Sequence, residues 1–204
     1  MSNVACFPFV LLILFTVGQP TKEPPYQVPT PKGWGKETLE LPPSFAKNMK
    51  WKGTEELRFS PGMFKADAAD FLSYSLLFWL PDDQKIDAKA LEKELLEYYR
   101  GLAKAVLESK KSEVDVNAFT LTIKEAKEKP AKRMGGEEVL GYFAELKWIE
   151  PFATGKPQTL RMEIQTWHSD KHKHHCIFIC ASPQPEIAEI WKAMRELRAD
   201  CTTP

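Results

Sequence analysis

All four histidines of this 204-residue chain lie in one short polar segment, residues 168–175. His168 and His174 flank a five-residue loop between two strand-like stretches, and we expect them to face each other as the last cross-strand pair, with His172 rising from the loop. Imidazoles in this arrangement are ligands for zinc, copper or nickel, and Asp170 could add an oxygen ligand. The alternative is a solvent-exposed turn that is merely rich in histidine, because two lysines in the loop oppose a dication.

Two glutamates form the second group of residues that could do chemistry. Glu145 and Glu163 fall on the polar faces of two strands that we expect to be neighbours. Directly opposite each other they would lie about 5 Å apart, near the carboxylate spacing of a retaining glycosidase. A shift of the register by two residues would instead place Lys147 opposite Glu163, and the reverse shift would place Arg161 opposite Glu145. We favour the ion-paired arrangements, because like charges placed directly opposite destabilise a sheet.

The same strands predict a polar binding face on the sheet. A period of two puts every second residue on one side, so this face comprises Glu145, Lys147, Arg161, Glu163, Gln165 and Trp167. Tryptophans can stack on sugars, and the chain has six. Trp79, Trp148 and Trp191 lie in hydrophobic stripes that predict core positions, which leaves Trp34, Trp51 and Trp167 as candidate surface platforms.

No catalytic or cofactor motif is present in the sequence. The chain contains no Gly-x-Ser-x-Gly, no phosphate-binding loop and no dinucleotide fingerprint, so we expect no cofactor.

The 28 basic and 28 acidic residues give the chain a formal net charge of zero. A neutral chain is unlike a nucleic-acid-binding protein, which presents a basic face, and unlike a polybasic protein of membrane surfaces.

Three cysteines follow the first hydrophobic segment. Cys176 and Cys180 lie four residues apart on one predicted strand, about 13 Å at ~3.3 Å per residue, which is too far for a disulfide. A closing helix of about 25 Å would run back along that strand and return Cys201 to the strand's beginning. If a native disulfide exists, it should therefore join Cys176 to Cys201; the alternative is three reduced, buried thiols.

Hydrophobic periodicity predicts the elements that must position these residues. A long amphipathic helix begins after Asp87 as its N-cap and ends near Ser109, and a second helix begins at Pro185. The second helix has Ile187, Ile190, Trp191, Met194, Leu197 and Cys201 on one face. Strands are expected at 38–41, 56–59, 71–80, 119–124, 139–149, 160–167 and 174–181. This order predicts an α+β fold, a single antiparallel β-sheet with one long middle helix and one C-terminal helix packed on it.

The amino-terminal part of the chain reads as an export signal followed by a tether. Residues 4–17 carry no charge and are too few to span a bilayer, and Thr16 and Gly18 suit a signal peptidase, so we expect a signal peptide at 1–18. A proline-rich leader follows at 19–36, and a single domain at 37–204. We therefore expect a protein exported to the periplasm or the extracellular space, with no integral membrane span after cleavage.

The last third of the chain resembles the PsbP-like fold. The resemblance lies in the order of strands from Tyr142 onward, the Ala181-Ser182-Pro183 exit and the helix that returns to Cys201. It is architectural, and it implies a binding or assembly protein more often than an enzyme. We therefore expect a non-enzymatic domain of the cell envelope that binds an unknown protein or small ligand. The alternative is an envelope hydrolase that uses polar residues of the exposed sheet face.

Overall fold

The protein is described from a computed structural model, which covers residues 27–127, 130 and 138–201. The predicted signal peptide, the first part of the proline-rich leader and most of the charged segment 127–138 lie outside the described residues.

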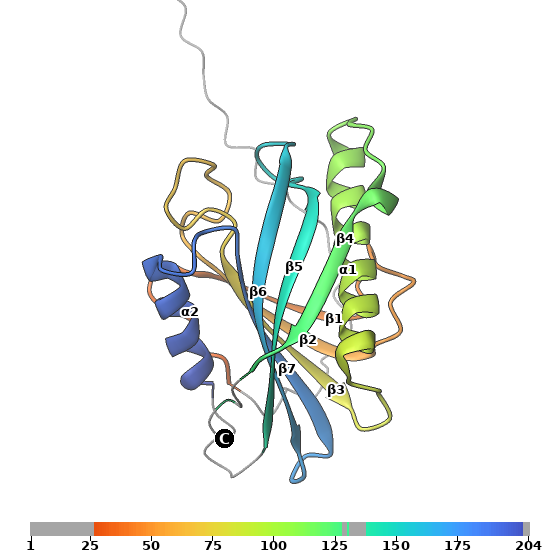
Figure 1. Cartoon of the computed structure of the whole chain (residues 1–204), viewed down its shortest axis with the longest axis vertical. Helices are drawn as coiled ribbons and strands as arrows, with labels where there is room; N and C mark the ends of the chain where they lie inside the picture. The colour runs from red at the N-terminus through yellow and green to blue at the C-terminus, as the bar shows by residue number, and fades with distance from the viewer. Residues whose placement is uncertain (1–26, 128–129, 131–137, 202–204) are drawn as a thin grey trace, which may run out of the picture.

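Among the described residues, a seven-stranded antiparallel sheet and two helices form the fold, as predicted (Figure 1). The sheet order is β1-β2-β3-β7-β6-β5-β4, so the last four strands in the sequence follow one another in reverse from the middle of the sheet to its edge. The strands are β1 (Gly35–Leu41), β2 (Gly53–Phe59), β3 (Tyr74–Pro81), β4 (Thr120–Glu125), β5 (Val139–Ile149), β6 (Pro157–Ser169) and β7 (His174–Ser182). The helices are α1 (Ala88–Ser109) and α2 (Glu189–Ala199), with a short 3-10 turn at Val116–Ala118.

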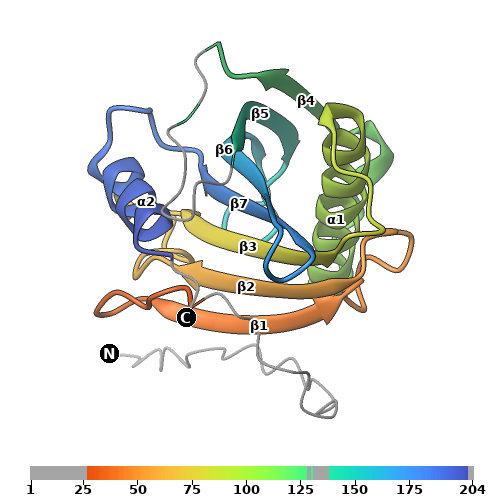
Figure 2. The same cartoon turned by 90° about the horizontal axis from the view of Figure 1, so that it is seen from below.

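The two helices cover opposite faces of the sheet (Figure 2). The central strand β3 is therefore buried on both sides, as its continuous hydrophobic run predicts. Its Leu76 and Phe78 belong to the larger core under α1, whereas Leu77 joins the smaller cluster under α2. The chain thus has two hydrophobic layers, and the sheet lies between them.

Helix α1 begins where the sequence predicts. The Asp87 side chain accepts a hydrogen bond from the Ala90 backbone N–H at 2.7 Å, a normal N-cap. Gly101 marks a close approach of α1 to the loop after β1. A Cβ at Gly101 would lie 2.2 Å from the Phe45 carbonyl oxygen.

In the part of the chain that the structure describes, no helix is long and apolar enough to cross a membrane.

Helix α2 begins later than expected, at Glu189 and not at Pro185. A turn precedes it, in which the Ala188 N–H donates to the Pro185 carbonyl at 2.8 Å. Ile187 consequently lies outside the helix and is 93% exposed, so its predicted place on the buried stripe is wrong. The rest of the stripe is correct, because Trp191, Met194, Leu197 and Cys201 are buried against the sheet.

The end of the predicted tether belongs to the domain. Val28 is buried in the cluster under α2, and Trp34 packs against the same cluster. The Arg58 guanidinium on β2 donates to the Val28 carbonyl at 2.5 Å and to the Pro29 carbonyl at 3.1 Å. The predicted tether, which extends to residue 36, is therefore too long. Arg58 donates hydrogen bonds to backbone carbonyls of the proline-rich segment that would otherwise lack a protein donor, and this attaches the segment to β2.

Candidate functional site

The register of β5 and β6 resolves the pairing of the charged residues. Glu145 lies opposite Arg161, and the Arg161 Nε is 3.9 Å from the Glu145 Oε1. Glu163 lies opposite Phe143, and Lys147 lies opposite Thr159. One of the two ion-paired alternatives is therefore confirmed. The direct opposition of two glutamates, which the glycosidase-like arrangement required, does not occur.

Glu163 is held by α2. The Arg195 guanidinium donates to the Glu163 carboxylate through Nε at 3.0 Å and through Nη2 at 2.5 Å, and the Arg198 Nη1 lies 3.4 Å away. The hydrogen bond to Glu163 raises the pKa of Arg195. The expectation that this whole face is exposed is thus wrong near Glu163, because α2 packs across it.

We expect replacement of Glu163 by alanine to lower the free energy of unfolding by about 2 kcal/mol, since two guanidinium groups in a partly buried place would lose their anion. Urea denaturation followed by circular dichroism measures this. Glu145→Ala is the matched control, and its exposed ion pair should contribute less than about 1 kcal/mol. Equal effects of the two substitutions would show that α2 does not depend on Glu163.

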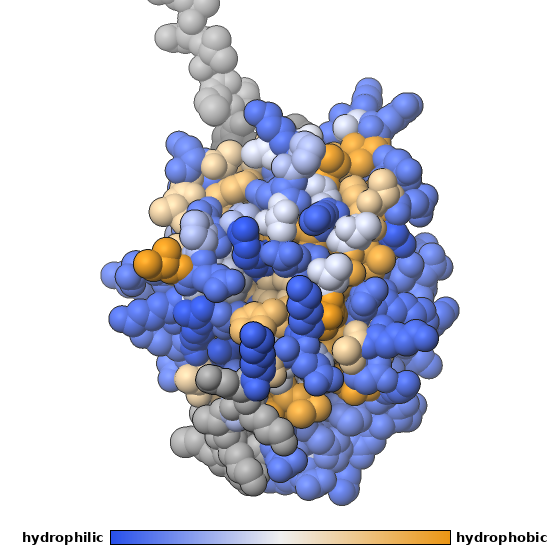
Figure 3. Space-filling view, viewed as in Figure 1, coloured by the Kyte–Doolittle hydropathy of each residue, from blue (hydrophilic) through white to orange (hydrophobic). Residues whose placement is uncertain are grey.

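A groove lies between β4, β5 and β6 on one side and the start of α2 on the other. Its volume is about 230 Å³. The strands contribute Thr122, Lys124, Phe143, Glu145, Arg161 and Glu163, and the helix side contributes Glu186 and Trp191. Phe143 is 50% exposed, and Ile187, which follows Glu186 in the chain, is also exposed to solvent. In the view of Figure 1, β4 to β6 lie in front, and Figure 3 shows the same view with small hydrophobic areas between hydrophilic ones.

The predicted binding residues therefore divide into three groups. Glu145, Arg161 and Glu163 line the groove together. Lys147 and Gln165 lie on the same face of the sheet but do not line it. Trp167 also lies on this face, yet it is only 3% exposed and belongs to the cluster under α2, so its role as a surface platform is wrong. The same burial applies to Trp51, while Trp79, Trp148 and Trp191 are core residues as predicted.

The histidine segment is divided between the two faces of the β6–β7 hairpin. His168 lies opposite His175, and His174 lies opposite Ser169, so the predicted pairing of His168 with His174 is wrong. β6 continues to Ser169 while β7 begins at His174 as expected, so the pairing differs by one residue from the predicted register, and a shift of one residue reverses the face. The His174 ring stacks on Trp79 at 4.4 Å between centroids, and His172 contacts the same Trp79 at 5.8 Å.

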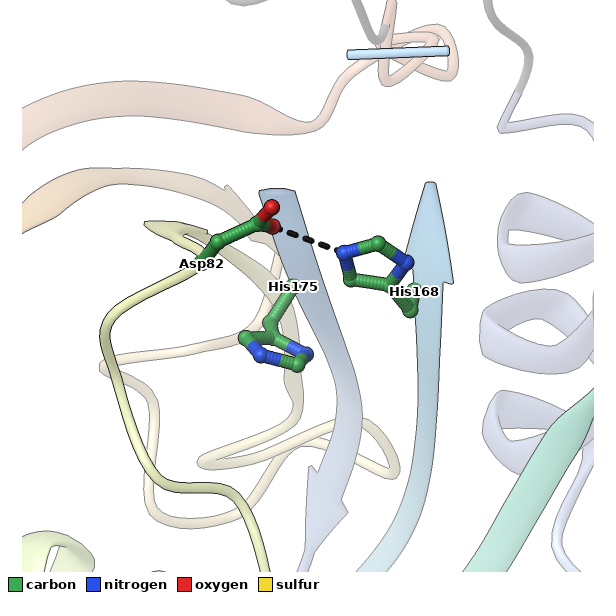
Figure 4. A group of neighbouring side chains, drawn as sticks. All are labelled: Asp82, His168 and His175. Atoms are coloured by element: carbon green, nitrogen blue, oxygen red, sulfur yellow. Dashed lines mark hydrogen bonds and ion pairs between the residues drawn. The ribbon is translucent and has the colours of Figure 1, made fainter. Parts of the chain in front are cut away.

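His168 instead has acidic neighbours. Its Nε2 lies 2.7 Å from the Asp82 Oδ1, and its Nδ1 lies 3.1 Å from the Asp170 Oδ1. Asp82, His168 and His175 point toward one another from the end of β3, from β6 and from β7 (Figure 4). Burial, with the nearby His168, lowers the pKa of His175.

Cys176, Cys180 and Cys201 are buried in the same cluster under α2. Cys176 and Cys201 both belong to it, as the predicted return of the closing helix requires. Cys180 lies beside the middle of α2, where its thiol is 3.5 Å from the Met194 carbonyl. Burial raises the pKa of the Cys180 thiol to about 12. The Cys176–Cys201 disulfide stays a prediction.

A carboxyl group is buried under α1, and the sequence pattern did not predict it. Glu55 on β2 is fully buried, and its Oε1 accepts a hydrogen bond from the Tyr98 hydroxyl at 2.9 Å. Burial raises the pKa of Glu55 to about 8, with a further contribution from Glu37. Its Oε2 has no hydrogen-bond partner among the described residues. The group lies inside the core, away from the groove, so we assign it to stability and not to the site.

Sequence reasoning also missed several members of the groove and of the histidine group. Phe143 alternates with buried residues on β5, and that exposed hydrophobic position was a usable signal. Glu186 lies in the turn before α2, which we had assigned to the helix. Asp82 follows the strand predicted at 71–80. No sequence signal relates it to His168, because the two are 86 positions apart.

Comparison with known proteins adds no further constraint, since no protein family model, no curated protein and no solved structure matches the chain.

Proposed function

We propose that this chain is an exported, non-enzymatic binding or assembly protein of the cell envelope, and that it receives side chains of a partner protein in the groove between β4–β6 and α2. The observation that carries the proposal is the combination of a charged groove with two solvent-exposed hydrophobic side chains, Phe143 in its lining and Ile187, which directly follows the lining residue Glu186 in the chain.

The size of the groove supports a protein partner. Sites for small molecules and cofactors usually have volumes of about 300–1,000 Å³ and are mainly hydrophobic. This groove is smaller, at about 230 Å³, and its lining alternates in charge, with Lys124 and Arg161 beside three glutamates. Such a surface accommodates one or two side chains of a partner, with ion pairs around them, as in the rim of a protein–protein interface.

The state of the carboxylates supports binding over hydrolysis. A glycosidase-like hydrolase needs two carboxyl groups that face the substrate. Here Arg161 pairs with Glu145, while Arg195 and Arg198 engage Glu163. Both carboxylates thus already have cationic partners from the protein. The PsbP-like resemblance of the last third of the chain points in the same direction, since it implies binding or assembly.

The test is affinity capture from the envelope fraction with the mature domain. We expect the double substitution Phe143→Ser, Ile187→Ser to weaken retention of the captured partner by about thirtyfold, because a central hydrophobic anchor contributes about 2 kcal/mol. Phe64→Ser is the matched control, since Phe64 is 60% exposed but lies outside the groove. Retention that is unchanged in the double variant, or lost equally in the control, would contradict the proposal.

A further inference from the structure

We infer that Asp82, His168 and His175 form a binding site for one divalent transition-metal ion, and that Zn²⁺ is the ion whose ligand preference it fits best. One oxygen and two imidazoles are the ligands of many three-residue zinc sites, in which water completes the tetrahedron. The site is distinct from the groove, and it differs from the set His168, His172 and His174 that the sequence predicts.

Geometry brings the three ligands together on a rigid frame. His168 and His175 are a directly opposed pair on neighbouring strands, with ring centroids 4.9 Å apart. Asp82 follows β3, which pairs with β7 on its other side. One ligand atom from each of the three residues lies within 4.8 Å of the others. Metal bonds of 2.0–2.1 Å require ligand separations of about 3.3 Å in a tetrahedron, so side-chain rotations that close at most about 1.5 Å would complete the site.

Asp170 supplies the support that metal-binding histidines normally have. Its Oδ1 lies 3.1 Å from the His168 Nδ1. A proton on Nδ1, donated to Asp170, leaves the Nε2 lone pair directed toward Asp82, where the ion would lie. This arrangement of carboxylate, histidine and metal ion fixes the tautomer and the ring orientation of the ligand.

The charges around the cluster also permit a dication. The two lysines of the loop are exposed, so solvent screens them. Asp82 and Asp170 lie at direct contact distance from His168. Two anions are therefore in contact with this ligand, and they favour a cation at the cluster.

The experiment is titration of the mature protein with Zn²⁺ by isothermal calorimetry, together with the visible spectrum of the Co²⁺-loaded protein. We expect one ion per chain and a four-coordinate Co²⁺ spectrum. His175→Gln and Asp82→Asn should each weaken Zn²⁺ binding by more than about a hundredfold, because each removes a ligand. Asp170→Asn should weaken it by about 10- to 100-fold, the usual effect of losing the group that orients a ligand.

His174→Gln is the matched control, because His174 is in the same segment but stacks on Trp79 on the other face of the hairpin. It should leave Zn²⁺ affinity unchanged. Thermal melts of every variant without metal establish that each one folds. An affinity that falls in His174→Gln as much as in His175→Gln, or the absence of a saturable one-to-one event in the folded wild-type protein, would overturn the inference.

Discussion

Replacing Trp191 by alanine is expected to lower the free energy of unfolding by about 3 to 5 kcal/mol, the usual cost of removing a large aromatic side chain from a core. Trp191 is 1% exposed and packs in the cluster between α2 and the sheet. Its indole N–H donates to the Gln184 carbonyl at 3.0 Å, which ties the start of α2 to the segment that leaves β7. Urea denaturation followed by circular dichroism measures the change.

Trp191→Phe separates the contribution of the buried ring from that of the hydrogen bond to Gln184. It keeps most of the buried ring and loses the hydrogen bond to Gln184, so we expect a cost of about 1 to 2 kcal/mol. Because Trp191 also lines the groove, partner capture by Trp191→Ala should fall along with stability. A loss below about 1 kcal/mol in Trp191→Ala would show that α2 is attached to the sheet mainly by other contacts.

The stability of the wild-type protein should fall as the pH rises, because of Glu55. Its pKa is about 8 in the folded chain and near 4.3 in an unfolded one. Between these values the folded state holds one more proton than the unfolded state, so the free energy of unfolding declines with increasing pH. The stabilisation that protonated Glu55 provides is fully present below the unfolded-state pKa, and it is lost as the pH rises toward and through the folded-state pKa. From about pH 5.5 to about pH 7.5 the expected loss is about 3 kcal/mol.

Glu55→Gln tests this assignment, because an amide cannot ionise and its oxygen can still accept from the Tyr98 hydroxyl. We expect the variant to lose the pH dependence that Glu55 contributes and to exceed the wild type in stability at about pH 7.5. Urea midpoints at the two pH values measure it, and the difference between the proteins removes the contribution of other groups, such as His175. Parallel pH profiles for wild type and variant would assign the titration elsewhere.

The sequence by itself determined the type of each element and the face on which its residues lie. Helix α1 was predictable because a period near four and the Asp87 cap are local properties. The common face of Glu145, Arg161 and Glu163 followed from the period of two in β5 and β6, at any register that keeps the hydrophobic residues of both strands on one side. The burial of β3 on both sides followed from its uninterrupted hydrophobic run.

Only the tertiary structure decided how those faces are used. The choice between the registers of β5 and β6 depends on the whole pairing from Val139 to Ile149, and two of the possible shifts formed ion pairs equally well. The start of α2 at Glu189 left Ile187 in solvent and brought Arg195 onto Glu163. Such contacts between distant segments leave no periodic pattern in the sequence of either segment. The hydrophobic period of each helix or strand is the same whichever partner it packs against.

In the histidine segment, too, the sequence determined one part and the tertiary structure another, and the difference depends on a single residue of register. The sequence identified its composition and its place at a hairpin, but the exact end of the strands decides which histidines share a face. Because the ladder closes at Ser169 and His174, His168 meets His175. Asp82 joins them only because β3 pairs with β7, a contact between strands separated by a helix and three further strands in the chain. Long-range strand pairing, which no local pattern encodes, therefore determined the composition of the proposed metal site.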